Sequence, residues 1–229
     1  MFDWIIVSIF APIILKTEKM EYIKDYKKEY KDLYLPKTTP MVLDVPEMQF
    51  VAVEGAGSPN EEAGAYQQAL EALYGIQYTI KMSKKGSQTP KGYFDYVVPP
   101  LEGLWWLDND AEFSIVNKSK FRWISLIRLP EFVDELVFEW ACREVSQKKK
   151  INVEKAKLLK IKEGLCVQCM HIGAYDDEPQ TLKLMTDFII ANNLQNDVSA
   201  TRRHHEIYLG DPRKTEVSKL KTVLRIPVK

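Results

Sequence analysis

Hydrophobic and polar residues alternate with two different periods along the first half of the chain. Residues 48–57, MQFVAVEGAG, are rich in β-branched and apolar side chains and end in glycines, which predicts a strand followed by a turn. Residues 61–75 instead place Tyr66, Leu70 and Leu73 on one helical stripe, which predicts a helix. Beyond a polar loop, two further apolar runs predict the remaining strands, at residues 93–100 and 121–130. The order of this first unit is therefore β-α-β-β.

The second half of the chain has the same order of predicted elements. A helix is predicted at residues 131–145, directly after Pro130. The lysine-rich residues 148–164 are then interpreted as a solvated connector rather than a basic binding site. The remaining elements are predicted as a strand at 165–175, a helix at 176–193, and two strands at 203–209 and 221–228.

Two β-α-β-β units predict an α+β fold in which helices cover one face of a mostly antiparallel sheet. We expect one domain over residues 20–229, with repeat one at about 48–130 and repeat two at about 131–229. The two uncovered sheet faces of such a pseudo-symmetric pair would enclose a central ligand cleft, which is a common place for a small-molecule site.

Composition and charge narrow the classes of function. The 229 residues are 45% hydrophobic and 28% charged, which is typical of a globular protein. Three cysteines are few and odd in number, which suits a reducing compartment such as the cytoplasm. Lys+Arg and Asp+Glu each number 32, so no net charge favours nucleic acid. We therefore expect a cytoplasmic protein that does not bind nucleic acid.

The first residues contain an apolar run from Trp4 to Leu15. This run is too short to span a bilayer, and no basic residue precedes it as a signal peptide would require. A natural start lies at Met20, which opens a charged, amphipathic stretch. We therefore expect residues 1–19 to be an extension outside the functional domain and the chain to have no membrane-spanning segment. A membrane-associated N-terminus is the alternative.

The predicted strand RHHEIYL, near the C-terminus, carries three titratable side chains in a row. Because side chains two apart share a face, His204, Glu206 and Tyr208 point one way. His205 and Ile207 point the other way, and we expect that face to pack against the helices. Glu206 and Tyr208 would then face the cleft, where a desolvated carboxylate can act as a general base or bind a polar ligand. The alternative is an exposed glutamate paired with a basic side chain.

A second concentration of unusual residues lies at 99–110, PPLEGLWWLDND. Adjacent Trp105 and Trp106 cannot share a strand face, so one could line the cleft while the other packs below it. Glu102 lies beside Gly103, where a turn would tilt its side chain toward the same opening. With 5 Trp, 11 Tyr and 9 Phe, the chain has enough aromatic surface for a flat-sided pocket that takes a planar ligand. Plain core packing is the alternative.

The cysteines and histidines do not predict a metal or redox site. Cys166 and Cys169 have C-x-x-C spacing, but their odd separation on a strand sends them to opposite faces, and no second pair follows. His171 is interpreted as a structural histidine, with a metal site shared with His204 or His205 as the alternative. The sequence contains no glycine-rich phosphate loop, no G-x-S-x-G and no H-E-x-x-H. We therefore expect neither a metal nor an organic cofactor.

Six blocks of the sequence resemble recurring blocks of the GyrI-like small-molecule-binding domain proteins, in the stand-alone group without a DNA-binding domain. These blocks are PPLEGLWW, RWISLIRLPEF, FEWA, EGLCVQCMHIGAYDDEPQT, HHEIYLGDPRKT and LKTVLRIPV. The resemblance runs from about Tyr26 to Lys229 and implies an SHS2-type fold of two β-α-β-β repeats around a cleft. In this family the glutamate of an E-x-Y motif lies at the centre of the ligand pocket, flanked by aromatic residues. The matching positions here are Glu206 and Tyr208.

Some stand-alone members are hydrolases that open the cyclopropane ring of DNA-alkylating cyclopropanoid toxins, while relatives fused to helix-turn-helix domains sense lipophilic cations or other drugs. The resemblance implies a detoxifying hydrolase with Glu206 as general base and Tyr208 as hydrogen-bond donor to the developing negative charge. The expected ligand is hydrophobic, planar or cationic, and its expected contacts are Glu102, Trp105, Trp106, Tyr175 and His204. The alternatives are a drug-sequestering module without chemistry and a partner-binding protein that shields another enzyme from toxins.

Overall fold

The computed structural model describes residues 22–107 and 120–229, so the predicted extension at residues 1–19 lies outside the described part. Its strands are β1 (Met41–Ala56), β2 (Leu101–Leu107), β3 (Phe121–Arg128), β4 (Ala156–Ile172), β5 (His204–Tyr208) and β6 (Lys221–Pro227). Its α-helices are α1 (Tyr26–Glu29), α2 (Lys31–Tyr34), α3 (Ala65–Met82), α4 (Glu135–Glu144) and α5 (Glu178–Ala191). Shorter helical segments are η1 (Ser83–Lys85), η3 (Val145–Lys149), η4 (Tyr175–Asp177) and η5 (Val217–Lys219).

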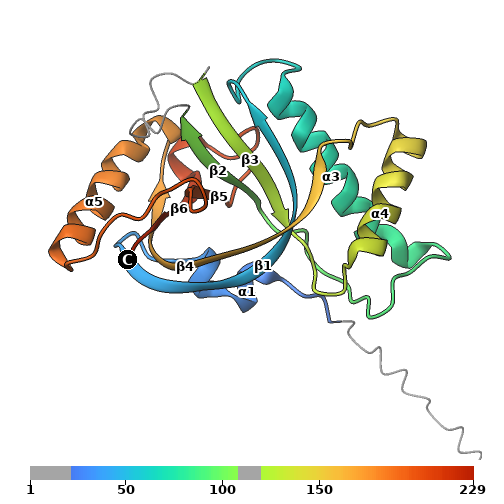
Figure 1. The fold of residues 1–229 in the computed structure, drawn as a ribbon, viewed down its shortest axis with the longest axis horizontal. Coiled ribbons are helices and arrows are strands. Elements are labelled where there is room, and N and C mark those ends of the chain that lie inside the picture. The colour runs from blue at the N-terminus through green and yellow to red at the C-terminus, as the bar shows by residue number, and fades with distance from the viewer. Residues whose placement is uncertain (1–21, 108–119) are drawn as a thin grey trace, which may run out of the picture.

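The strands form one closed antiparallel barrel, in the order β1-β3-β2-β5-β6-β4 (Figure 1). The predicted α+β class with an antiparallel sheet is therefore confirmed. The halves do not form two separate sheets, however, because β1 pairs with β4 along most of its length and β2 pairs with β5. These two junctions turn one face of the sheet into the interior of the barrel and leave the other face outside.

Two predictions about these elements are wrong, one of a strand and one of a connector. In residues 93–100 only Tyr96 makes a strand-like bridge, and the strand expected there is instead β2, LEGLWWL. The lysine-rich segment is not a connector, since its second half is the beginning of β4 and pairs with β1. The exposed lysines of this part alternate with apolar side chains that pack against the core, including Leu158 and Ile161. A run of lysines therefore did not exclude a strand with one solvated face.

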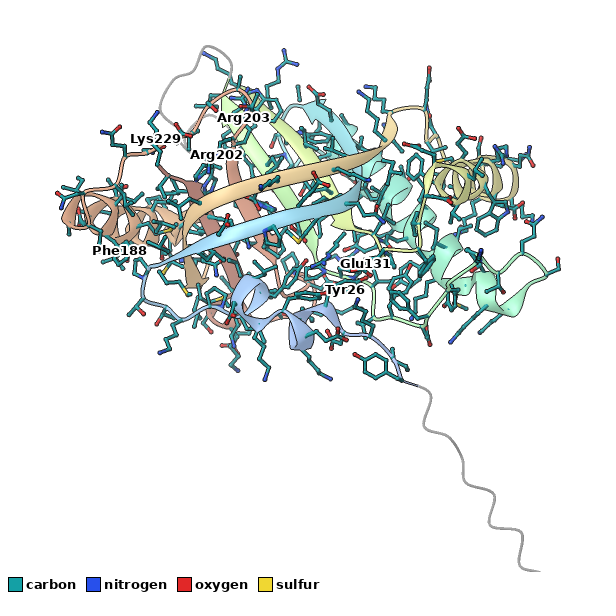
Figure 2. The ribbon with its side chains drawn as sticks, turned by 60° about the horizontal axis from the view of Figure 1, so that its bottom comes forward. Tyr26, Glu131, Phe188, Arg202, Arg203 and Lys229 are labelled. Atoms are coloured by element: carbon teal, nitrogen blue, oxygen red, sulfur yellow. The ribbon has the colours of Figure 1, made fainter. Side chains whose placement is uncertain are left out.

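Strand β4, one of the two long curved strands in Figure 1, bends at Gly164, where the backbone φ is +67°. Before the bend Ile161 packs inside the barrel, and after it Cys166 does, so the inward positions change from odd to even. The guanidinium of Arg202 donates to the carbonyl oxygens on either side of Gly164, at 2.7 and 2.6 Å. Figure 2 shows Arg202 close to Lys229 at this end of the barrel. The bend leaves the side chain of Glu163 buried.

Three clusters of buried side chains stabilise this arrangement. Helices α3 and α4 pack on the outer face of β1 and β3, with Val51 and Leu73 at the contact. Helix α5 packs on the outer face of β4 and β6 through Val167 and Met185. The interior cluster, which includes Leu126, is completed by α1 and α2. No helix in the described ranges is long and apolar enough to cross a membrane.

Candidate functional site

Strand β5 presents His204, Glu206 and Tyr208 on the outer face of the barrel. In the pairing of β5 with β2, Glu206 lies opposite Gly103 and His204 lies opposite Trp105. His204 Nε2 is 3.2 Å from Glu206 Oε1, and the Tyr208 hydroxyl donates to Glu206 Oε2 at 2.7 Å. Trp105 Nε1 in turn donates to the Tyr208 hydroxyl at 2.8 Å. A relay of hydrogen bonds thus runs from Trp105 through Tyr208 to Glu206.

Aromatic rings from three other elements surround this relay. Tyr66, in the first turn of α3, stacks on Trp105 with ring centroids 5.7 Å apart and meets Trp123 edge-on at 5.1 Å. Tyr175, in η4, meets the ring of Tyr208 edge-on at 5.8 Å. These rings leave Glu206 nearly buried, with only 7% of the residue exposed. A weakly solvated carboxylate beside aromatic faces suits general-base chemistry or binding of a cation.

The tyrosines of the site stay protonated over the physiological pH range. Burial raises the pKa of Tyr208 well above its usual value, and the Glu206 carboxylate raises it further. Burial, with the carboxylates of Glu178 and Glu206, raises the pKa of Tyr175 to about 12. Both phenols therefore act as hydrogen-bond donors rather than as bases.

Glu178 is a second carboxylate of this site that the sequence did not reveal. It is the first residue of α5 and only 3% exposed, and its charge acts on both Tyr175 and Tyr208. In the sequence it belongs to an acidic first helical turn, where the helix dipole alone explains a glutamate. Tyr66 was also missed as a site residue, because its place on the apolar stripe of α3 indicates plain core packing.

The predicted orientation of β5 relative to the helices is wrong. Ile207 points into the barrel interior, whereas Tyr208 packs with the cluster under α3. Closure of the barrel is the reason, since the face without α3 and α5 becomes the interior and is filled by side chains. Glu206 therefore lies on the same side of the sheet as these helices, and not between two sheet faces.

Two of the expected ligand contacts do not join Glu206. Glu102 lies within β2 rather than in a turn, and its side chain points into the barrel interior, where the Tyr34 hydroxyl donates to it at 3.3 Å. Trp106 and Trp105 lie on opposite faces of β2, and the Arg203 guanidinium lies 4.6 Å from the ring centroid of Trp106. Of the expected contacts, the structure brings together Trp105, Tyr175 and His204 around Glu206.

Cys166, Cys169 and His171 lie in surroundings that indicate structural roles. Cys166 lies in the interior cluster and Cys169 lies under α5, on opposite faces of β4 as predicted. The ring of His171 lies 2.9 Å from both the Thr181 hydroxyl and the Ala174 carbonyl oxygen, which fixes the turn before Tyr175. Residues 22–107 and 120–229 contain no cluster of three or more side chains suited to hold a metal ion.

The side chains of Trp105 and Tyr208 occupy the space beside Gly103, and a larger residue at position 103 is expected to displace them. A Cβ at this position would lie 2.5 Å from Trp105 Nε1 and 3.2 Å from the Tyr208 hydroxyl. We expect Gly103→Val to push the indole away, destabilising the protein by about 1–3 kcal/mol and shifting the tryptophan fluorescence. Urea unfolding measures the first effect. Gly86→Ala is the matched control, because its added Cβ meets only an ordinary contact at 3.6 Å. An unchanged emission spectrum in Gly103→Val would contradict the relay.

The sequence matches the GyrI-like small molecule binding domain over residues 38–229. A crystal structure of an uncharacterized conserved protein from Listeria innocua is 45% identical, with a TM-score of 0.85, over 90% of this chain and 100% of that chain. Two structures of a hydrolase from Listeria innocua are 46% identical, with TM-scores of 0.81 and 0.83, over 90% and 91% of this chain and 100% of theirs. No protein of curated function matches the sequence. With this match across most of its length, the chain belongs to the GyrI-like small-molecule-binding domain family.

Proposed function

We propose that this protein is a cofactor-independent hydrolase that opens electrophilic cyclopropanoid compounds of the DNA-alkylating kind, and so detoxifies them. The observation that carries the proposal is the relay from Trp105 through Tyr208, which holds the nearly buried Glu206 carboxylate among aromatic rings. The hydrolase from Listeria innocua, 46% identical over the whole of its chain, supports the reaction class. An activity of this kind in the cytoplasm would confer resistance to such compounds.

In the proposed reaction Glu206 takes a proton from a water molecule as the water oxygen bonds to a ring carbon of the substrate. The strained carbon–carbon bond breaks, and its electron pair moves onto a carbonyl conjugated with the ring. The protonated Glu206 then returns the proton, so that the net change is the addition of one water. Tyr208 donates to Glu206 in the structure. Once the carboxyl carries the proton, the phenol can turn to the substrate oxygen on which negative charge develops.

The substrate would lie against the rings of Tyr66, Trp105 and Tyr175, which approach the relay from α3, β2 and η4. Flat rings on several sides favour a planar, hydrophobic body. His204, which contacts the same carboxylate as Tyr208, would supply a further polar contact. Glu102 and Trp106 are not part of this proposed site, because their side chains point away from it.

A sequestering module without chemistry is the second candidate, and the presence of two carboxylates favours it. Glu178 and Glu206 both act on the same pair of tyrosines. Buried carboxylates beside aromatic faces attract lipophilic cations through charge and cation–π interactions. In that case the ligand would be bound and released unchanged.

Product analysis separates the two candidates. We expect mass spectrometry of a cyclopropanoid compound incubated with the wild-type protein to show a product heavier by one water. A bound but unchanged compound would support sequestration, and its release on competition with a lipophilic cation would identify the ligand class. Absence of both turnover and binding would contradict the proposed function.

We also infer that the fold consists of two related β-α-β-β repeats. The strand order β1-β3-β2 in the first half has its counterpart in β4-β6-β5 in the second, and a long helix follows the first strand of each half. The β2–β5 junction between the halves then carries the proposed site, because Gly103 and Glu206 face each other across it.

A further inference from the structure

The interior of the barrel holds a cluster of charged residues directly behind the proposed site. Glu102, Glu163, His205 and Arg225 come from β2, β4, β5 and β6, and none of them is more than 8% exposed. Burying charges is costly, and well-packed apolar side chains of similar volume are often at least as stabilising. Stability alone therefore does not account for four charged groups in this place.

His205 is the centre of this cluster. Its Nε2 lies 3.0 Å from Glu102 Oε2, and its Nδ1 lies 3.0 Å from Glu163 Oε1. Arg225 Nη1 donates to the other carboxylate oxygen of Glu163 at 2.5 Å, and Arg225 Nη2 donates to the Leu33 carbonyl at 3.1 Å. Two carboxylates are thus balanced by one imidazolium and one guanidinium, provided that His205 carries its proton.

Strand β5 carries His205 of the interior cluster on one face and Glu206 and Tyr208 of the proposed site on the other. Strand β5 has only five residues, and Glu206 follows His205 directly. The residues before β5 are already attached to β4, because the Arg202 guanidinium donates to the carbonyl oxygens at the β4 bend. His205 attaches β5 from the inside, to β2 through Glu102 and to β4 through Glu163.

We propose that His205 is a positioning residue for the site on the outer face. Its imidazolium, held between the carboxylates of Glu102 and Glu163, fixes the short strand β5. Fixing β5 sets where Glu206 and Tyr208 point, so the site keeps its geometry only while His205 is charged. The consequence for turnover rests on the proposed function, whereas the consequence for the geometry of the relay does not.

The charges around His205 give the proposal a defined pH range. Burial alone would lower the pKa of His205, but Glu163 and Glu102 raise it to about 9. The other polar groups packed around His205 and its two carboxylates are Arg225, the Tyr34 hydroxyl, which donates to Glu102, and the Gln168 side-chain oxygen, which accepts from Arg225. Burial raises the pKa of the Cys166 thiol to about 12, so this neighbour stays neutral. Because the folded pKa is raised, the stabilisation is complete below about pH 6.5 and is lost as the pH rises through about 9.

The test follows the relay itself and needs no ligand. The protein is labelled with 5-fluorotryptophan, and the ¹⁹F signal of Trp105, assigned from Trp105→Phe, is recorded between about pH 6 and pH 10. We expect a shift with a midpoint near pH 9 in the wild type. The shift should be absent in His205→Gln. In Glu102→Gln, which removes one of the two stabilising carboxylates, the midpoint should fall by about one pH unit or more.

Glu54→Gln, at an exposed carboxylate of β1, is the matched control and should leave the midpoint unchanged. If His205→Gln does not fold, the ¹⁹F midpoint of Glu102→Gln is sufficient to test the positioning role. The same midpoint in Glu102→Gln and in the wild type would overturn the proposal. If the wild type also turns over a cyclopropanoid compound, the alkaline limb of kcat should move with the ¹⁹F midpoint. A ¹⁹F shift that follows His205 without any turnover would refute the hydrolase and leave the positioning role standing.

Discussion

Replacing Glu206 with glutamine is expected to lower the rate of cyclopropanoid hydrolysis by about 10²- to 10⁴-fold, the usual contribution of a positioned general base. Glutamine has nearly the same shape and can still accept from the Tyr208 hydroxyl, which donates to Glu206 at 2.7 Å. The variant should therefore fold and bind the compound, but it has no group to take a proton from water. Single-turnover kinetics with mass-spectrometric detection measures the rate, and fluorescence quenching of the tryptophans measures the binding.

Glu178→Gln is the matched variant for this experiment, because Glu178 is a second buried carboxylate whose charge acts on the same tyrosines, Tyr175 and Tyr208. We expect it to lower the rate far less than Glu206→Gln does. The reverse order of effects would assign the base to Glu178. Full activity of both single variants would contradict a carboxylate base in this site.

The sequence predicted the local geometry of the candidate site better than its surroundings. A period of two places His204, Glu206 and Tyr208 on one face of a strand whatever the fold around it, and the structure agrees. The opposite placement of Trp105 and Trp106 on β2 follows from the same rule. These statements need only the strand period, so they did not depend on which strands pair.

Statements that depend on long-range pairing could not be made from the sequence. Whether two antiparallel sheets stay apart or close into a barrel is decided by the β1–β4 and β2–β5 junctions, which join strands far apart in the chain. Without them, the helix-covered face of β5 was assigned to the wrong side. Glu102 was directed toward the same opening as Glu206 because a turn was expected at Gly103, whereas this segment is the strand β2 and Glu102 lies inside the barrel with His205. Glu178 acts on Tyr208 because η4, which leads directly into α5, packs against β5 through the rings of Tyr175 and Tyr208.

The interior cluster leads to the largest expected effect on stability. Replacing Arg225 with methionine would leave two carboxylates, on Glu102 and Glu163, with only His205 to balance them inside the barrel. Removing one partner of a buried ion pair in this way typically costs about 3–5 kcal/mol. We expect the free energy of unfolding to fall by about that amount, measured by urea denaturation near neutral pH. Arg213→Gln is the control, since that arginine pairs with Asp211 on the surface, and its unfolding midpoint should not change.

The double variant Glu163→Gln with Arg225→Gln separates lost charge balance from lost packing. Glu163→Gln removes one negative charge and Arg225→Gln removes one positive charge. Together they leave the carboxylate of Glu102 facing the imidazolium of His205. Because the interior is then neutral again, the double variant should be more stable than the sum of the two single losses implies, by about 1–3 kcal/mol. Strictly additive losses would show that Arg225 stabilises the barrel through its other contacts, such as the one with the Leu33 carbonyl. The expected coupling instead ties the stability of the barrel to the same charges that, in our proposal, hold β5 and its glutamate in place.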